Sequence, residues 1–233
     1  MEVADVIATH VIGPILLLLL VAGFRPISRV DAILTVPAVA VPFAFLWLAG
    51  RWHLASIWFR YALPLGVSAV TIICWRRGRR LPRYASNGVR TWFARVVKLG
   101  LAAYTAALTA SAIAGSHLER PMVSLKFPLR DGYFYVGQGG ATASLNYHVI
   151  NPTQRYALDI VKLAPWGNRA VRLYPRSLGE YASYGAPVYA PCAGVVQHVE
   201  GSVRDNAIDG QRDRAQPEAI TSSFGVWERT WTF

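Results

Sequence analysis

Histidine, cysteine and carboxylate side chains are the groups in this chain that could bind a metal or transfer a proton. The sequence has five histidines and two cysteines, of which three histidines and Cys192 follow residue 115. Zinc takes neutral imidazole, thiolate and carboxylate ligands, and a catalytic zinc keeps one position for a water whose pKa falls to about 7. Such a centre needs three protein ligands and a base, often histidine. The candidates for metal chemistry therefore lie mainly after residue 115.

The elements that must position these side chains are short and rich in β-branched and aromatic residues. Turn-forming pairs, such as Asp131 before Gly132 and Asn151 before Pro152, separate them. Helical periodicity is weak across 116–233, so this part of the chain is predicted to be an all-β domain. The predicted strands are 133–136, 156–161, 188–190 and 194–199.

Five segments in this part of the chain carry a family resemblance. Residues 138–140 read Gln-Gly-Gly, 146–148 Asn-Tyr-His, 154–160 Gln-Arg-Tyr-Ala-Leu-Asp-Ile, 184–196 Tyr-Gly-Ala-Pro-Val-Tyr-Ala-Pro-Cys-Ala-Gly-Val-Val and 205–206 Asp-Asn. In this order they resemble the lysostaphin/LytM-type zinc metallopeptidases, over about residues 127–206. The resemblance implies an antiparallel β-sheet of the duplicated hybrid motif fold and hydrolysis of peptide cross-links in peptidoglycan.

The resemblance also implies metal ligands. The family's Asp ligand maps onto Asp159, and its early His ligand maps onto His148, because the position of the common His-x-Gly-x-Asp spacing is Arg155 here. The late His-x-His pair, which supplies the third ligand and the general base, is missing, since no histidine follows His198. We therefore expect Zn²⁺ to bind weakly or not at all, and little or no peptidase activity.

A structural interpretation of the same residues stays open. His148 is then an ordinary loop histidine, and Asp159 an acid at a strand end that is bonded to Arg155. His117, at the membrane boundary, and His198, on the solvent face of a strand, are not expected to be ligands. Cys192 is expected to pack rather than bind zinc.

The tail 207–233 does not resemble the next strand of such a domain. One permitted back-translation of residues 218–233, read two bases later, encodes Gly-Asn-His-Val-Val-Ile, which is typical of the family after its Asp-Asn turn. We therefore expect that a frameshift after about Pro217 truncated the domain. A sheet without its last strands would expose an unpaired edge and favour aggregation.

Charge separates the chain into two regions, 1–115 and 116–233. The first has 12 lysines and arginines against 3 acidic residues, and the second has 12 against 10. The excess positive charge therefore lies in the more apolar region, which suits a membrane protein better than a nucleic-acid-binding one. Four spans of near the required ~20 residues are predicted at 7–24, 32–48, 54–75 and 96–115.

Orientation follows from the cations. Residues 76–98 hold eight of them and no acidic residue, so this loop is predicted to be cytoplasmic. Residues 116–233 then lie outside the cytoplasmic membrane, and Cys74 and Cys192 lie on opposite sides and cannot pair. The acidic N-terminus argues against a cleaved signal peptide. Arg60, within a span, is expected to reach the membrane interface rather than to transport ions.

The predicted fold is thus a four-helix transmembrane bundle followed by an incomplete, lysostaphin-like all-β domain. The predicted function is that of a membrane-anchored zinc metalloendopeptidase-like protein, with peptidoglycan or peptide substrates and impaired catalysis. One alternative is an inactive cell-wall-binding or regulatory module. Another is a transport role of the bundle itself.

Overall fold

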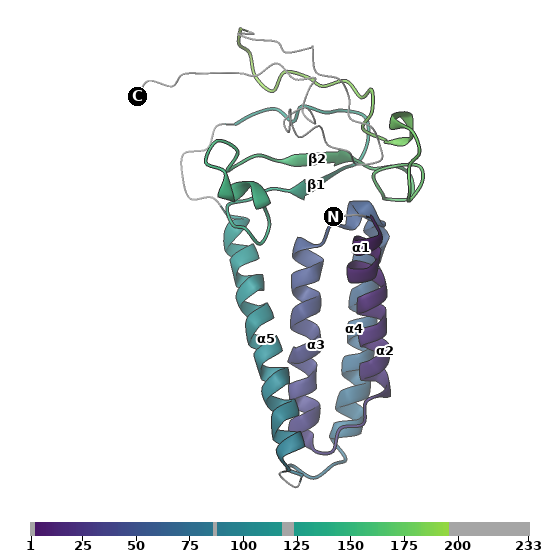
Figure 1. Ribbon diagram of the computed structural model, residues 1–233, viewed down its shortest axis with the longest axis vertical. Coiled ribbons are helices and arrows are strands. Elements are labelled where there is room, and N and C mark those ends of the chain that lie inside the picture. Colours follow the sequence, from purple (N-terminus) through teal and green to yellow (C-terminus); the bar gives the residue numbers. More distant parts are fainter. Residues whose placement is uncertain (1–2, 86–87, 118–123, 196–233) are drawn as a thin grey trace.

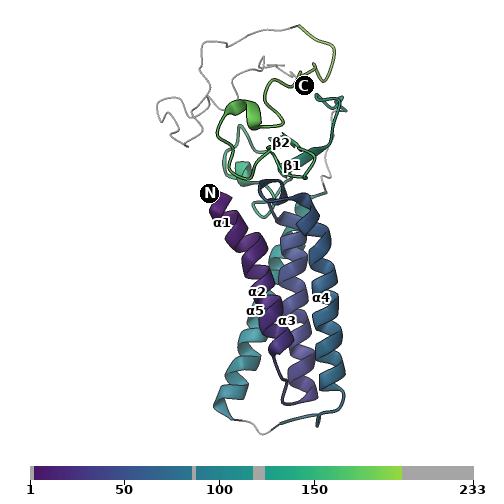
Figure 2. The ribbon, with the colours of Figure 1, turned by 90° about the vertical axis from the view of Figure 1, so that its right-hand side faces the viewer.

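The computed structural model describes residues 3–85, 88–117 and 124–195 (Figure 1). Helices form a bundle, and a two-stranded sheet with irregular loops lies over one end of it. Figure 2, turned by 90°, shows the same arrangement. We call the end beneath the sheet the sheet end (residues 49–57 and 115) and the opposite end the arginine end (residues 23–29 and 76–90).

The first helical segment leads from the sheet end to the arginine end. It consists of α1 (Val3–Ile7), one π-helical turn η1 (Ala8–Ile12) and α2 (Gly13–Gly23). Pro14 has no N–H to give to the preceding turn, and the N–H of Gly13 bonds to the carbonyl of Ala8, five residues earlier. The apolar part, Ala8–Gly23, is shorter than the other helices of the bundle.

Among the residues that the structure describes, three helices are long and apolar enough to cross a membrane, which agrees with three of the four predicted spans. They are α3 (Arg29–Ala49), α4 (Ile57–Gly78) and α5 (Val89–Gly115). By the length and apolar composition of these helices, the chain is therefore a membrane protein. The span predicted at 7–24 is helical too, but it is not among these three.

Helices α4 and α5 start at other residues than predicted, α4 later and α5 earlier. Ser56 caps α4, its side chain accepting a hydrogen bond from the N–H of Trp58, so this helix starts after residue 54. Helix α5 starts at Val89 rather than 96, because Arg90 and Arg95 are themselves helical. The basic loop predicted at 76–98 is therefore largely made of helix ends.

The bundle is held by contacts of α3 with α4 and α5 and of α2 with α4. Buried side chains gather near the sheet end, where Trp52 of the 3-10 turn η2 (Trp52–Leu54) is fully buried. Because lipid tails are as apolar as these side chains, close van der Waals packing rather than transfer out of water stabilises such contacts within a membrane bundle. This core contains Val39, Phe43, Trp52 and Leu63, with Leu17, Leu18, Val21, Leu46, Val67 and Tyr135 packed against it.

Charged groups inside the bundle have specific neighbours. Asp31, in the first turn of α3, forms an ion pair with Lys98 of α5. Arg60 of α4 stacks on Trp47 of α3, with its Cζ atom 4.1 Å from the ring centre. A cation over an indole face is attracted by the ring quadrupole. Arg60 therefore contacts an aromatic neighbour in the bundle.

The sheet consists of β1 (Phe134–Gln138) and β2 (Asp159–Lys162), paired antiparallel. The register shifts between Val136 and Gln138, so Gly137 is a bulge residue and Gln138 lies opposite Asp159. Two 3-10 turns complete the elements, η3 (Tyr147–Ile150) and η4 (Leu178–Glu180).

The predicted all-β domain appears only in part within residues 124–195. The strand predicted at 133–136 corresponds to β1. The one predicted at 156–161 corresponds to β2 only in its second half, since Tyr156 ends a turn and 157–158 have no regular structure. The remainder of the described region is irregular apart from the two 3-10 turns. The strand predicted at 194–199 lies mostly outside the described residues.

The strand predicted at 188–190 is wrong, and prolines explain why. Tyr189 donates to the carbonyl of Pro128, and Lys126 donates to the carbonyl of Pro191, each at 2.8 Å. These two bonds have an antiparallel register. Each pair lacks its return bond because proline has no N–H, so no regular ladder forms.

The sheet region is fastened to the bundle by hydrogen bonds at all three helix ends. At the end of α3, Tyr135 donates its hydroxyl to the carbonyl of the C-cap residue Gly50 at 2.6 Å. At α4, Ser56 donates to the carbonyl of Trp166 at 2.7 Å. At α5, the carbonyl of Gly115 accepts from the N–H of Ala141 at 2.8 Å. The two regions are therefore packed together rather than merely joined by chain.

Candidate metal site

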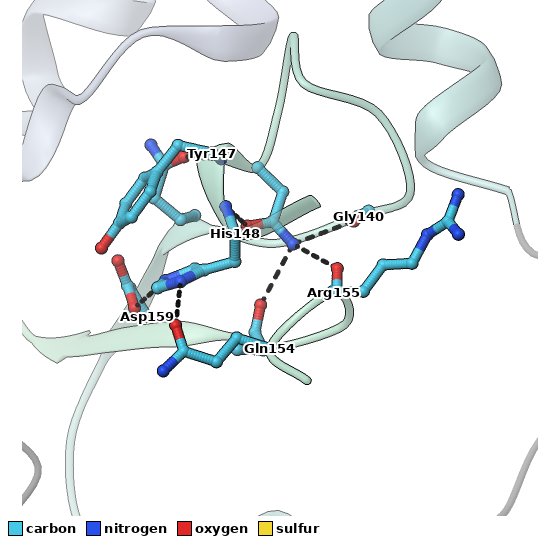
Figure 3. Close-up of polar contacts among 9 residues, drawn as sticks. Gly140, Tyr147, His148, Gln154, Arg155 and Asp159 are labelled. Carbon is cyan, nitrogen blue, oxygen red and sulfur yellow. Dashed lines mark hydrogen bonds and ion pairs between the residues drawn. The ribbon is translucent and has the colours of Figure 1, made fainter. Parts of the chain in front are cut away.

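The structure brings together the two side chains that the sequence predicted as metal ligands. His148 lies in η3 and Asp159 is the first residue of β2, and Nε2 of the histidine is 3.0 Å from Oδ1 of the aspartate (Figure 3). The histidine side chain is 12% exposed and the aspartate side chain 41% exposed. The pair therefore lies at the surface of the sheet region, with the carboxylate reachable from solvent.

Buried Asn146 fixes the loop that presents His148. Its side-chain nitrogen donates to the carbonyls of Gly140, Arg155 and Ala157 at 3.0–3.3 Å, and its Oδ1 accepts from the N–H of His148 (Figure 3). Its exposure is 0%. One side chain thus ties the segment before His148 to the segment that leads into β2.

The imidazole of His148 has a neighbour on each side. Its Nδ1 lies 3.3 Å from Oε1 of Gln154, and the ring of Tyr147 packs against it with centroids 4.0 Å apart. A partner at Nδ1 orients the ring and leaves Nε2 directed at Asp159. The N–H of Tyr147 donates to Oε1 of Gln138, which the bulge of β1 places opposite Asp159.

Arg155 does not pair with Asp159 in the structure. Its guanidinium lies toward Tyr156, with Cζ 5.9 Å from that ring, and its carbonyl accepts a hydrogen bond from Asn146. The ion partner of Asp159 is His148 instead. The structural interpretation in which Asp159 is bonded to Arg155 is therefore wrong.

The 3.0 Å contact between His148 Nε2 and Asp159 Oδ1 is a hydrogen-bond distance, and it is also near the separation of two ligand atoms on one zinc. Two ligand atoms that are each about 2.0–2.1 Å from one tetrahedral zinc lie roughly 3.3 Å apart, close to the separation of Nε2 and Oδ1. A catalytic zinc needs three protein ligands. Among residues 3–85, 88–117 and 124–195, no group of three or more histidine, cysteine or acidic side chains could hold a metal ion.

The other candidate groups lie elsewhere or outside the described residues. Cys192 is exposed, Cys74 is buried in α4, and His117 is exposed just beyond α5. His198 falls within the segment 196–233, which is outside the described residues. None of the three described side chains, Cys192, Cys74 and His117, forms a metal-binding group with His148 and Asp159.

Sequence reasoning missed His53, a buried histidine beneath the sheet. It lies in η2 at 8% exposure, its ring centre is 5.1 Å from that of Tyr135, and its carbonyl accepts from the N–H of Arg169. Burial, followed by the charges of Arg169 and Arg51, lowers the pKa of His53 to about 4. A lone histidine in a short turn gives no sequence signal for this role.

Comparison with known proteins adds no relative. No family model matches the chain, and no curated protein or solved structure matches it.

Proposed function

We propose that this chain is a membrane-anchored, zinc metalloendopeptidase-like protein of the lysostaphin/LytM type. His148 and Asp159 supply two ligands of its metal site. Peptide-bond hydrolysis, with peptidoglycan as the expected substrate, is impaired because the sequence has no His-x-His pair.

The observation that carries the proposal is the 3.0 Å separation of His148 Nε2 and Asp159 Oδ1. These two residues are eleven positions apart in the chain and come from different elements. They are also the two positions that the family resemblance selects. The coincidence of the two conditions is what supports the proposal.

The metal, when bound, would polarise a carbonyl and activate a water. The chain's own residues hold its ligands in place: Gln154 orients the imidazole, and Asn146 fixes the loop. Two ligands fall short of the three that a catalytic zinc requires, so no hydrolytic step is derived from them.

A second candidate function is an inactive cell-wall-binding or regulatory module. The same shortage of ligands favours it, together with the absence of a histidine after His198 that could act as the base. In that case the domain would bind a peptide without cleaving it.

Zinc binding and peptidoglycan hydrolysis by the full chain in detergent test the proposal. Titration against a chromogenic chelator should show weak zinc binding, which is lost in His148→Ala and in Asp159→Asn. His117→Ala, which changes an exposed histidine outside the site, should bind zinc like the parent. Release of peptidoglycan fragments should stay at background in all four proteins.

Three results would contradict this proposal. Equal zinc binding by the parent and by Asp159→Asn would remove the aspartate from the site. Zinc that survives exhaustive dialysis against chelator would require further ligands. Fragment release that depends on His148 would mean that catalysis is intact.

A further inference from the structure

The arginine end of the bundle contains an open pocket of about 790 Å³ between the ends of α2 and α4. Its volume is in the range of ligand pockets, ~300–1,000 Å³. Buried Pro26 and partly buried Leu81 contribute its apolar wall. Five arginines line the rest, namely Arg25, Arg76, Arg77, Arg79 and Arg80.

The end of α4 brings these arginines together. Arg76 and Arg77 belong to its last turn, Arg79 is its C-cap residue, and Arg80 lies in the turn that follows. Arg77 donates its Nη1 to the carbonyls of Ala22 and Phe24, which ties the end of α2 to α4. The pocket is therefore built before any ligand arrives.

The neighbouring loop is also held in place. The N–H of Arg29 donates to the carbonyl of Pro82 at 2.9 Å, and its side chain donates to the carbonyl of Leu81 at 2.8 Å. A wall fixed in this way loses little conformational entropy when it binds a ligand.

Positive charge in the pocket is not neutralised within the part of the chain that the structure describes. The ion pairs there use Lys98, His148 and Arg172, and none of the five arginines. The nearest acid along the chain, Asp31, is occupied by Lys98. Clustered guanidinium groups repel one another, and an anion relieves that repulsion. Guanidinium also matches phosphate through two parallel hydrogen bonds.

The pocket lies where a membrane ends. It is flanked by apolar α2 and α4, and Trp75, in the last turns of α4, is 59% exposed with the guanidinium of Arg79 5.2 Å from its ring. Exposed tryptophans at helix ends are typical of the level of lipid headgroups. Phosphate groups of the bilayer are therefore present at this height in high local concentration.

We propose that this pocket is a binding site for the phosphate of an anionic phospholipid headgroup. The arginines contact the phosphate, and the wall of Pro26 and Leu81 contacts the glycerol end of the lipid. The site needs neither the sheet region nor a metal, and it is independent of the function proposed above.

Native mass spectrometry of the full chain in detergent tests this site, with phosphatidylglycerol as the anionic probe and phosphatidylcholine as the neutral one. Arg76→Gln combined with Arg80→Gln should weaken phosphatidylglycerol binding about thirtyfold, since each of the two cations contributes roughly 1 kcal/mol. The matched control combines Arg83→Gln with Arg90→Gln, which removes the same charge from the same end outside the pocket. It should change the affinity by less than about twofold, because solvent screens remote charges.

Two further measurements, on a lysine variant and with inorganic phosphate as competitor, test whether the pocket binds the lipid itself. Arg76→Lys with Arg80→Lys keeps the charge and should retain most of the affinity, and helical circular dichroism should be equal in all variants. Inorganic phosphate should not displace the lipid. Equal losses in both glutamine variants, equal binding of the two lipids, a lysine variant as weak as the glutamine one, or displacement by inorganic phosphate would each overturn the lipid site.

Discussion

At the scale of single residues, His53 shows how burial and position set the chemistry of a side chain. Its Nδ1 is buried without a hydrogen-bond partner among the described residues, and two arginines lie in its electrostatic environment. The neutral imidazole is the form that such surroundings favour. His53 therefore belongs to the packing between sheet and bundle as an uncharged group.

The titration of His53 predicts that stability depends on pH. Its pKa is about 4 in the folded protein and 6.5 in an unfolded chain, so between these values the unfolded state binds the extra proton. The contribution of His53 to the free energy of unfolding is therefore fully present above about pH 6.5. It falls by about 3 kcal/mol as the pH drops to about 4. Urea unfolding of the full chain in detergent across this range measures the slope.

A matched pair of variants tests whether His53 causes this pH dependence of the free energy of unfolding. His53→Gln should lose stability at neutral pH but also lose most of the slope between pH 6.5 and 4. His117→Gln, which removes an exposed histidine, should keep the slope of the parent. If both variants keep it, His53 is not the titrating group.

At the scale of secondary structure, the bulge in β1 is the element that aligns the candidate site. Gly137 is the unpaired residue, and a Cβ atom there would lie 2.8 Å from Cε1 of His53. Available space, not backbone conformation, therefore demands glycine at this position. Beyond the bulge, Gln138 faces Asp159 and accepts from the N–H of Tyr147.

Gly137→Ala is expected to destabilise the sheet by about 1–3 kcal/mol, because the buried ring of His53 must move to admit the methyl group. Amide hydrogen exchange should become faster in both β1 and β2. Gly179→Ala is the control, since a Cβ atom there meets nothing within 4 Å. Unchanged hydrogen exchange in β1 after Gly137→Ala would show that the ring of His53 moves aside without a loss of stability.

Local sequence patterns predicted the three long helices and singled out His148 and Asp159, which lie side by side; their role as metal ligands stays a prediction. Apolar runs and serine caps are short-range signals, and α3 and α4 follow them closely. His148 and Asp159 were found through a motif whose order is kept in the chain. The pattern at 188–190 failed because it scored β-forming side chains, whereas Pro128 and Pro191 remove the N–H groups that a ladder requires.

Local sequence patterns could not predict the interface between the sheet and the bundle. It joins Gly50 to Tyr135 across 85 positions and Ser56 to Trp166 across 110. Contacts at that separation depend on how the helix ends are arranged, which hydropathy and charge do not encode. The role of His53 belongs to the same interface and was missed for the same reason.

At the scale of the whole molecule, the hydroxyl of Tyr135 is predicted to hold the sheet on the bundle. Tyr135→Phe leaves the carbonyl of Gly50 buried without this donor, which costs about 1–3 kcal/mol. Hydrogen exchange should become faster in β1 and η2 together. Tyr133→Phe removes a hydroxyl from an 84% exposed ring and should leave both unchanged. Faster exchange in β1 alone would place the effect within the sheet.

The bond between Gly115 and Ala141 also determines how far the ligand pair stands from the bilayer. A domain on a flexible tether sweeps through a range of heights, whereas this one rests on the ends of helices whose length is fixed at about 1.5 Å per residue. Transmembrane helices tilt when bilayer thickness changes. In a thinner or thicker membrane, His148 and Asp159 would therefore change their inclination to the membrane surface together with α5.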